Sequence, residues 1–310
     1  MKKSLNNFLH SPFFDYRNKD MKTYPKVSII VLNYNGQDCL ENCLESLSQV
    51  VYPNTEVIIV DNGSTDNSAF LAQKKYPHFC FLFNTNNEGF AKGMNKGIRK
   101  AFSAGSNFFV LFNYDATIEA SSVEQVIHQM VKDPQIGLAS PLIYDTYGKN
   151  MWFGKGKINF WRMRVEHTTP STHELGQGAY QSEFLTGCVL FIARSTVEKI
   201  GFLDENFFLY YEDADYSLRT KKAGLLCVVV PSGKVYHTEK SNQKSTKVYF
   251  LVLSGLIFFQ KYAPLWLKPY HKMYVTMRRG KNLIERYLFP TTASLEVFRA
   301  YNDFFYDKRS

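Results

Sequence analysis

Residues 108–112 are five consecutive apolar residues, Phe-Phe-Val-Leu-Phe, and they constrain the fold more than any other stretch of the chain. A run this short without a polar interruption is typical of a strand buried on both faces, as in a parallel sheet covered by helices. Asn113-Tyr114-Asp115 follows at once. Open α/β sheets bind ligands at the carboxyl edge of their strands, where an acid is free to hold a divalent cation. Asn-x-Asp after a strand is also common as a turn or a helix cap.

Three earlier strands are predicted, and each also ends in polar residues. Apolar runs at 27–32, 56–60 and 79–83 alternate with segments of helical periodicity, which predicts parallel strands joined by right-handed crossovers. The segments that follow them, 33–36, 61–66 and 84–89, are rich in Asn, Asp and Gly. Turn formation explains the glycines, but the repeated acids and amides favour a ligand-binding edge. No Gly-x-Gly-x-x-Gly follows the first strand and no P-loop motif is present, which argues against ordinary dinucleotide and P-loop sites.

The second half of the predicted sheet is less regular. We expect a helix over 121–132 and strands over 136–144, 184–192 and 225–230. Residues 148–180 lose periodicity and are rich in aromatic residues and glycine. A segment this long without a pattern is either a functional loop, able to close over a ligand, or a disordered insert.

Three acids stand together behind four aromatic residues. Glu212, Asp213 and Asp215 begin a predicted helix whose later turns are basic and which ends before Gly224. Acids first and bases last suit the helix dipole, so capping is one explanation. The other is that a carboxylate beside apolar groups serves as a general base. His237 also follows a strand end, where metal ligation competes with an ordinary structural role.

All of the excess positive charge lies in the C-terminal quarter of the chain. Residues 240–310 hold 13 of the 37 Lys and Arg and 4 of the 28 Asp and Glu, which leaves 24 of each elsewhere. This asymmetry favours an anionic partner, either a membrane surface or nucleic acid, but no nucleic-acid recognition motif is present. The apolar run over 248–259 is too short to span a bilayer as a helix. It is either a core helix or a membrane-surface segment between basic residues.

Cysteine usage and the N-terminal segment both indicate a cytoplasmic protein. The five cysteines are scattered and form no Cys-x-x-Cys pair, which argues against a disulfide framework or a zinc site. Residues 1–26 lack the continuous apolar core of a secretory signal.

In combination and in this order, the motifs resemble those of the family 2 inverting glycosyltransferases of GT-A fold, and especially their rhamnosyltransferase-like branch. The residues that carry the likeness are 27–36, 60–66, Asn87-Glu88-Gly89-Phe90, Asn113-Tyr114-Asp115, Thr186-Gly187, Glu212-Asp213 and His237. The resemblance implies an α/β, GT-A (Rossmann-like) fold with a mostly parallel sheet flanked by helices and a helical basic C-terminal extension. The expected division is an N-terminal extension (1–24), a glycosyltransferase domain (25–240) and a C-terminal region (241–310).

The resemblance also implies roles for individual residues. Asp61 matches the acid that accepts a hydrogen bond from the ring imide of uracil or thymine. The other donor-binding positions that it implies are Asn33, Tyr34, Asn87, Gly89, Asn95 and Asn113. Asp115 and His237 match the ligands of Mg²⁺ or Mn²⁺, and Asp213 matches the general base. Two residues depart from the usual pattern: Asn113 stands where many relatives carry an acid, and Lys92 where a small residue is usual.

The implied activity is inverting transfer of a sugar from a nucleotide-sugar donor, with dTDP-rhamnose favoured over a UDP-sugar. The implied acceptor is a cell-surface polysaccharide or a lipid-linked glycan, with the protein cytoplasmic or peripheral on the inner face of the cell membrane. Such a transfer needs a base for the acceptor hydroxyl and a cation for the departing diphosphate. The alternative is a non-catalytic module of the same fold that binds nucleotide-sugars or glycans, against which the presence of Asp115, Asp213 and His237 together argues.

Overall fold

The first half of the sheet is a parallel α/β unit. Residues 24–238 and 245–306 are described by the computed structural model. The first elements alternate as predicted: β1 (Val27–Asn33), α1 (Leu40–Ser48), β2 (Thr55–Asp61), α2 (Ser68–Lys75), β3 (Cys80–Phe83), α3 (Phe90–Ser103) and β4 (Phe108–Asn113). β1 pairs in parallel with β2 and β4, and β2 with β3, so all four strands end at one edge. Asn33 lies opposite Asp61 in this register.

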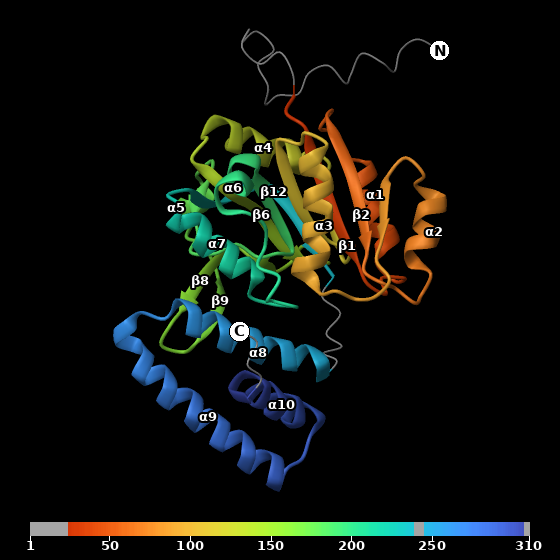
Figure 1. Ribbon diagram of the computed structural model, residues 1–310. Coiled ribbons are helices and arrows are strands. Elements are labelled where there is room, and N and C mark those ends of the chain that lie inside the picture. The colour runs from red at the N-terminus through yellow and green to blue at the C-terminus, as the bar shows by residue number, and fades with distance from the viewer. Residues whose placement is uncertain (1–23, 239–244, 307–310) are drawn as a thin grey trace, which may run out of the picture.

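The second half of the sheet is mixed. Its strands are β5 (Ala116–Ile118), β6 (Ile136–Asp145), β7 (Met151–Phe153), β10 (Tyr180–Gln181), β11 (Val189–Ala193) and β12 (Leu226–His237). Within the described residues the main order is β10-β12-β6-β11-β4-β1-β2-β3. β11 runs antiparallel to β4 and β6, whereas β12 runs parallel to β6. The helices α4 (Ser122–Lys132), α6 (Arg194–Ile200) and α7 (Glu212–Lys222) join α1–α3 in covering the sheet (Figure 1), so the predicted mostly parallel sheet flanked by helices is confirmed.

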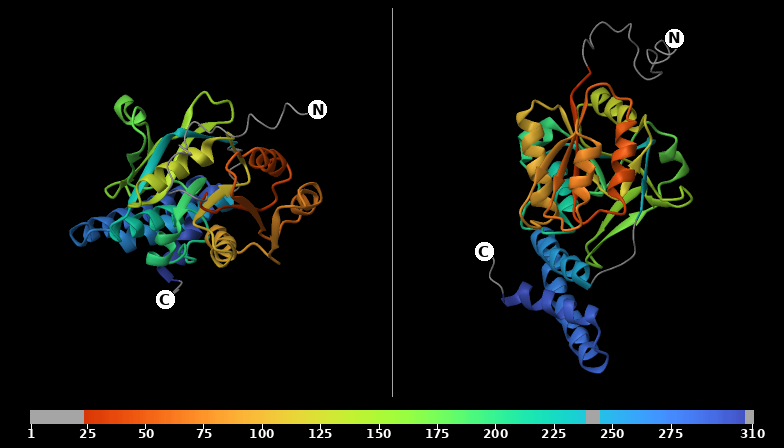
Figure 2. Two further views of the ribbon diagram at one scale, coloured as in Figure 1. Left: turned by 90° about the horizontal axis from the view of Figure 1, so that it is seen from above. Right: turned by 90° about the vertical axis from the view of Figure 1, so that its right-hand side faces the viewer.

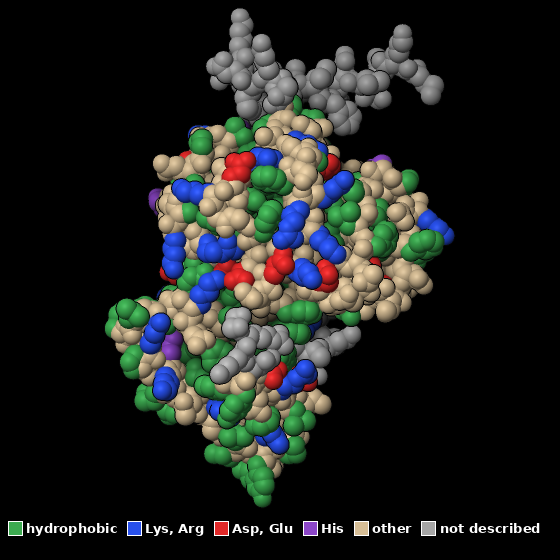
Figure 3. Space-filling model, viewed as in Figure 1, with side chains coloured by type: hydrophobic (Ala, Val, Ile, Leu, Met, Phe, Trp, Pro, Cys, Tyr) green, Lys and Arg blue, Asp and Glu red, His purple; other side chains and the backbone are tan. Residues whose placement is uncertain are grey.

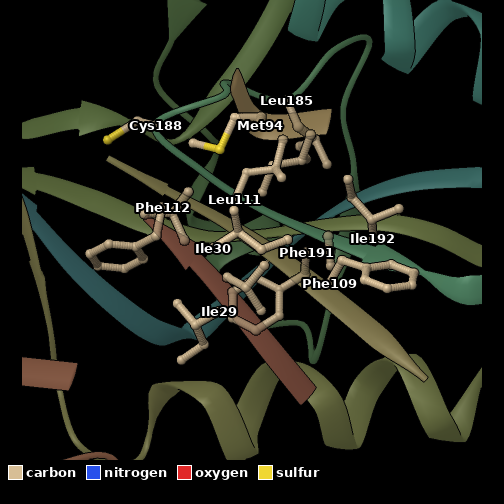
Figure 4. Packing of buried hydrophobic residues seen from close by; sticks show 14 of the residues in the cluster. Ile29, Ile30, Met94, Phe109, Leu111, Phe112, Leu185, Cys188, Phe191 and Ile192 are labelled. Carbon is tan, nitrogen blue, oxygen red and sulfur yellow. The ribbon is translucent and has the colours of Figure 1, made fainter. Parts of the chain in front are cut away.

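β4 and its neighbours β1 and β11 form the centre of the core. Phe109, Phe112 and Phe191 are fully buried, and Figure 4 shows them packed with Ile29 and Ile30 of β1. Burying a side chain of this size contributes about 1.5–3 kcal/mol. The apolar run at 108–112 is therefore a central strand, and the polar motif after it starts from a rigid position.

The strand predicted over 184–192 exists only in its second part, as β11. Residues 184–188 form a loop, and two of its N–H groups bond side chains of α7 instead of a neighbouring strand. Leu185 donates to Ser217 Oγ (3.1 Å), and Gly187 donates to Asp213 Oδ2 (2.8 Å). The strand prediction was wrong here because apolar character does not reveal that helix side chains satisfy the backbone.

The aromatic segment 148–180 has secondary structure of its own, so it is not a disordered insert. The expected closure of this segment over a ligand stays a prediction. The segment contains β7 and β10, the antiparallel pair β8 (Lys155–Asn159) and β9 (Arg164–Thr168), and α5 (Thr172–Leu175). Strands of two to five residues are too short to show a period of two in the sequence, which is why periodicity failed here.

Three helices follow the sheet. They are α8 (Ser245–Tyr262), α9 (Lys268–Leu288) and α10 (Thr292–Tyr306), with the 3₁₀ turn η1 (Leu265–Leu267) before α9. They lie beyond the edge at which β1 ends (Figure 1, Figure 2). Phe258 and Phe259 of α8 are fully buried and contact Tyr211, so the run over 248–259 is a core helix and not a membrane-surface segment. In the two described ranges, no helix combines the length and the apolar character needed to cross a membrane.

Candidate active site

The ends of β1 and β2 are cross-linked around one buried carboxylate. Asp61 Oδ1 accepts hydrogen bonds from the Asn33 side-chain amide (2.8 Å) and from the Ser64 hydroxyl (2.6 Å). Asp61 Oδ2 accepts one bond from the described residues, the Ser64 N–H (3.1 Å), so this oxygen keeps acceptor capacity. The Asn33 amide also donates to the Ser68 hydroxyl (2.8 Å), and Asn33 is fully buried. Asn33 therefore orients Asp61, while its own Oδ1 has no hydrogen-bond partner among the described residues. Its expected place along a ligand base stays a prediction.

Asn62 links β2 to the segment before α3. Its amide donates to Asn87 Oδ1 (2.9 Å) and to the Gly89 carbonyl (3.0 Å), and its Oδ1 accepts the Glu88 N–H (3.1 Å). Gly89 has φ +85°, and a Cβ there would lie 2.5 Å from the Phe208 carbonyl oxygen, so only glycine fits. Asn87 and Gly89 thus lie at the sheet edge, and Gly89 lies against Phe208 in the segment just before α7.

The other implied donor residues occupy different positions. Asn95 is fully buried and bonds both the N–H (3.0 Å) and the carbonyl (2.9 Å) of Leu203, so it ties α3 to that loop. Its expected place along the nucleotide stays a prediction. Tyr34 is 41 % exposed directly after β1. Asn113 is half-buried at the end of β4, where its N–H donates to the Cys188 carbonyl (2.9 Å).

Asp115 and His237 come together although they lie 122 positions apart in the chain. β12 pairs antiparallel with β5 and brings His237 opposite Ala116. His237 Nε2 then lies 3.2 Å from Asp115 Oδ1. Two adjacent ligands of an octahedral ion, each about 2.1 Å from it, are about 3 Å apart, so this carboxylate and imidazole fit one shared cation. No group of three or more His, Cys, Asp or Glu suited to a metal occurs in residues 24–238 and 245–306.

The surroundings of His237 favour a bound positive charge. Burial lowers the pKa of its imidazole, but Cys188 and the Asp115 carboxylate outweigh that effect and raise the pKa to about 11. The Asp115 carboxylate therefore favours a positive charge beside it, which a protonated imidazole or a divalent cation can supply. Trp152 of β7 packs edge-to-face on the His237 ring (4.5 Å between centroids) and also contacts His167 of β9 (4.8 Å).

Two tyrosines in the left-handed conformation place the acid cluster. Tyr210 and Tyr211, with φ of 69° and 66°, immediately precede α7. Such backbone costs about 1–3 kcal/mol per residue and persists only where packing enforces it. The ring of Tyr211 is buried against Phe258 and Phe259. α8 therefore holds the start of α7 in position.

Asp213 projects toward the loop before β11. Its Oδ2 accepts the Gly187 N–H (2.8 Å), and its Oδ1 accepts the Ala214 N–H (2.7 Å). Burial raises the pKa of the carboxyl, an effect that these two amides and His167 partly offset. Because Gly187 directly precedes Cys188, which bonds the end of β4, the carboxylate lies near the strand end that carries Asp115.

The two neighbouring acids have other surroundings. Asp215 is fully buried and accepts hydrogen bonds from Arg219 Nε (2.7 Å), Lys261 Nζ (2.7 Å) and the Tyr262 hydroxyl (2.6 Å). Glu212 is also buried, and burial, with Asp213 and Asp215 nearby, raises its pKa well above the ordinary value. Asp213 is the partly exposed acid of the three, and a partly exposed carboxylate with a raised pKa suits proton abstraction.

Sequence reasoning missed Ser64, Ser68, Asn62 and Trp152. Ser68 is the first residue of α2 and Ser64 lies in the loop before it, so no period of a single element relates the two serines. The Asn62 side chain bonds four residues of the segment 84–89, Asn84, Asn87, Glu88 and Gly89, which no local pattern reveals. Trp152 lies on a strand of three residues, within the segment that showed no periodicity.

Residues 28–201, more than half of the chain, match the family described as Glycosyl transferase family 2. Among curated proteins, the chain is similar to the N-acetylglucosaminyl-diphospho-decaprenol L-rhamnosyltransferase of Mycobacterium tuberculosis, with 28 % identity over 236 residues, covering 67 % of this chain and 75 % of the relative. It is also similar to a dTDP-rhamnosyl transferase of Shigella flexneri, with 25 % identity over 221 residues, covering 71 % and 70 %.

Two solved structures show the same arrangement of elements. The mannosyltransferase PcManGT from Pyrobaculum calidifontis, in complex with GDP-Man and Mn²⁺, has a TM-score of 0.60 at 15 % identity, covering 94 % of this chain and 90 % of its own. GalNAc-T7 with UDP, GalNAc and Mn²⁺ has a TM-score of 0.61 at 17 % identity, covering 75 % of this chain and 48 % of its own, so this chain spans about half of that protein. These likenesses show the GT-A fold. With the match over residues 28–201, the chain belongs to glycosyl transferase family 2, as its sequence motifs indicated.

Proposed function

We propose that this protein is an inverting glycosyltransferase that transfers rhamnose from dTDP-rhamnose, or failing that a sugar from a UDP-sugar, to a cell-surface polysaccharide or a lipid-linked glycan. The observation that carries the proposal is the convergence of the Asp115–His237 pair and the Asp213 carboxylate near the end of β4. The printed names of two curated relatives, both rhamnosyltransferases, support the choice of sugar.

The donor base would be recognised at the ends of β1 and β2. Thymine and uracil each present one imide N–H, which Asp61 Oδ2 has the capacity to accept. Adenine and cytosine lack an imide N–H, so the carboxylate favours dTDP and UDP over adenine and cytosine nucleotides. Tyr34 is exposed beside this position and would cover the ring, while Asn87 and Gly89 would lie along the rest of the nucleotide.

Asp115 and His237 would hold Mg²⁺ or Mn²⁺. Oxygen and imidazole ligands suit both ions, and the 3.2 Å between the two ligand atoms fits a shared ion. A bound ion supplies positive charge to the departing nucleoside diphosphate. The Asp115 carbonyl accepts the Thr238 N–H (2.8 Å), which keeps the ends of β4 and β12 together. The two solved structures named above contain Mn²⁺, which supports the choice of cofactor.

Asp213 would remove the proton from the acceptor hydroxyl. The hydroxyl oxygen attacks the anomeric carbon from the face opposite the diphosphate, the bond from that carbon to the diphosphate oxygen breaks, and the configuration inverts. The amides of Gly187 and Ala214 hold the carboxylate in place for this step. No covalent intermediate on the protein is involved, so one base is sufficient.

We place the acceptor at the cytoplasmic face of the cell membrane. The name of the mycobacterial relative contains a diphospho-decaprenol acceptor, which supports a lipid-linked substrate. The excess of Lys and Arg in residues 240–310 supports a position near an anionic surface.

The test is release of nucleoside diphosphate from a panel of donors in the presence of Mn²⁺ and a rhamnosyl-acceptor glycan. We expect dTDP-rhamnose to be consumed fastest, EDTA to stop the reaction, and the new linkage to have the opposite anomeric configuration to the donor by NMR. A non-catalytic module of the same fold would bind a donor in calorimetry and release no diphosphate from any of them.

A further inference from the structure

The helix α9 buries mostly polar residues and exposes apolar ones, the opposite of an ordinary surface helix. Its buried residues are His271, Val275 and Asn282, which contact α8 or α10. Two of these three carry polar side chains, whereas surface helices ordinarily bury an apolar stripe. The His271 ring bonds the Phe160 carbonyl (2.6 Å), and the Asn282 amide donates to the Ser294 carbonyl (3.2 Å).

The side of α9 that faces solvent is apolar. Successive helix residues turn by about 100°, so residues 273, 277, 284, 287 and 288 share the side opposite the buried residues. These are Met273, Met277, Ile284, Tyr287 and Leu288, and they are between 55 and 87 % exposed. We call these five residues the outer face of α9. A continuous apolar stripe of this kind on a helix marks an interaction surface.

Basic side chains flank the outer face on both sides. Lys272 lies at one border of the stripe and Lys281 at the other, and both are exposed. α9 carries six Lys and Arg against the single acid Glu285. Arg279 is used internally, with bonds to Asn302 (3.4 Å) and Tyr306 (3.2 Å). Lys281 forms an exposed ion pair with Glu285 (3.5 Å), which is weak enough in water for the lysine to bind a second anion.

The apolar surface continues at both ends of α9. Leu265 and Trp266 precede the helix and are 81 and 68 % exposed, and Phe289 after it is 72 % exposed. The Trp266 ring contacts the ring of Trp161, in the turn between β8 and β9, with 5.6 Å between the ring centroids. Figure 3 shows hydrophobic side chains interspersed with Lys and Arg over this part of the molecule. Tryptophan and lysine beside an apolar face are the residues that settle at a lipid–water boundary.

We propose that the outer face of α9 docks on an anionic lipid surface, with its apolar side chains among the acyl chains and the flanking lysines at the headgroups. An apolar side with a basic border is typical of helices that lie in the membrane interface. A second copy of the chain fits less well, because it would bring two helices with five excess positive charges each against one another. The inference rests on the proposed function in one respect: a lipid-linked acceptor gives a transferase a use for such a face.

The position of the helices agrees with this role. α8 contacts the segment before α7, through stacking of Phe208 on Phe250 (4.4 Å) and a bond from the Ser254 hydroxyl to the Leu209 carbonyl (2.8 Å). The C-terminal helices therefore join the domain beside the start of α7, where the proposed base stands. Docking through α9 would keep that side of the domain close to the membrane.

The experiment is sedimentation of the full-length protein with two kinds of vesicle, phosphatidylcholine alone and phosphatidylcholine with about one third phosphatidylglycerol. We expect binding to the anionic vesicles that weakens with salt. The variant Met277→Gln/Ile284→Gln/Leu288→Gln should bind at least about 10-fold more weakly, because apolar insertion is lost. The variant Lys272→Gln/Lys281→Gln should lose about 5-fold for each lysine. All five positions are exposed, so the fold should tolerate both variants.

Matched controls lie elsewhere on the surface. Phe70→Gln/Leu71→Gln removes two equally exposed apolar residues of α2, and Lys100→Gln/Lys199→Gln removes two exposed lysines, so both should bind vesicles as the wild type does. Vesicle binding requires no turnover, so the result stands whether or not dTDP-rhamnose is the donor. Equal binding to both vesicle types, or unchanged binding of the two α9 variants, would overturn the proposal. So would a wild-type dimer that the Met277→Gln/Ile284→Gln/Leu288→Gln variant converts to a monomer.

Discussion

Asp213→Asn replaces the carboxylate that we propose as the base, and it should remove activity while leaving the fold intact. Asparagine keeps the shape of the side chain, but a nitrogen replaces one of the oxygens that accept from Gly187 (2.8 Å) and Ala214 (2.7 Å). One hydrogen bond is therefore lost, at about 1 kcal/mol. Burial raises the pKa of Asp213 above its value in the unfolded chain, so its ionised form destabilises the fold at neutral pH. Removing that charge offsets the lost bond, and we expect the free energy of unfolding to change by no more than about 1 kcal/mol.

The effect on turnover should be much larger. A positioned general base contributes about 10²–10⁴-fold, so kcat should fall by at least about 100-fold. Binding of the donor should not change, because Asp213 bonds the main-chain N–H groups of Gly187 and Ala214 and not Asp61 or the Asp115–His237 pair.

Asp215→Asn, two positions along the same helix, is the matched comparison and should behave in the opposite way. Asp215 is fully buried and accepts from Arg219, Lys261 and Tyr262. Removing one partner of a buried ion pair costs about 3–5 kcal/mol. Because Arg219 and Lys261 are 22 and 39 % exposed and partly rehydrate, we expect about 2–4 kcal/mol. That corresponds to a fall in Tm of about 5–10 °C.

The assay measures three quantities for the wild type and both variants: kcat from diphosphate release, donor Kd from calorimetry, and Tm from thermal unfolding. The assignment of roles requires Asp213→Asn to lose turnover at unchanged Tm and Kd, and Asp215→Asn to lose Tm. Near wild-type turnover of Asp213→Asn would refute it and move the base to Glu212 or Asp215. A large fall in Tm for Asp213→Asn would refute the argument that removing the buried charge compensates for the lost hydrogen bond.

EDTA should abolish turnover, and Asp115→Ala or His237→Ala should raise the Mn²⁺ concentration for half-maximal turnover at least about 10-fold in a metal titration; unchanged titrations would contradict a shared ion. Asp61→Ala should weaken dTDP-rhamnose binding at least about 10-fold in calorimetry, because a charge-assisted hydrogen bond to the base is lost. The acid limb of the pH–rate profile should lie above the ordinary aspartate pKa of about 4, since turnover is lost as the pH falls through the raised pKa of Asp213, and a limb at or below pH 4 would count against this base. Lys261→Met should lower stability by about 1–2 kcal/mol, measured by denaturant unfolding. Burial lowers the pKa of Lys261, but pairing with Asp204 and Asp215 outweighs burial and raises the pKa above 10.5. The stability difference between the wild type and Lys261→Met should therefore be complete at neutral pH and disappear only as the pH rises through the raised pKa.

Much of the fold and several site positions could be predicted from local patterns. The apolar runs that became β1 to β4 and the polar residues after them are short-range features, because burial and turn chemistry act within about ten residues. The acids at the start of α7 and the polar end of β4 were visible for the same reason. Right-handed crossovers then required the strand ends to share one edge, as the parallel pairing of β1, β2 and β4 confirms.

The tertiary structure decided which of these residues meet. Asp115 and His237 come within 3.2 Å because β5 pairs with β12, and Asp215 is occupied because Lys261 reaches it from α8. Residues 184–188 leave the sheet because side chains of α7 satisfy their backbone. Likewise, α8 is covered and the outer face of α9 is open because of how the C-terminal helices pack on the domain. Each outcome depends on contacts between residues far apart in the chain, and local periodicity carries no information about which distant partner satisfies a given side chain or covers a given helix face.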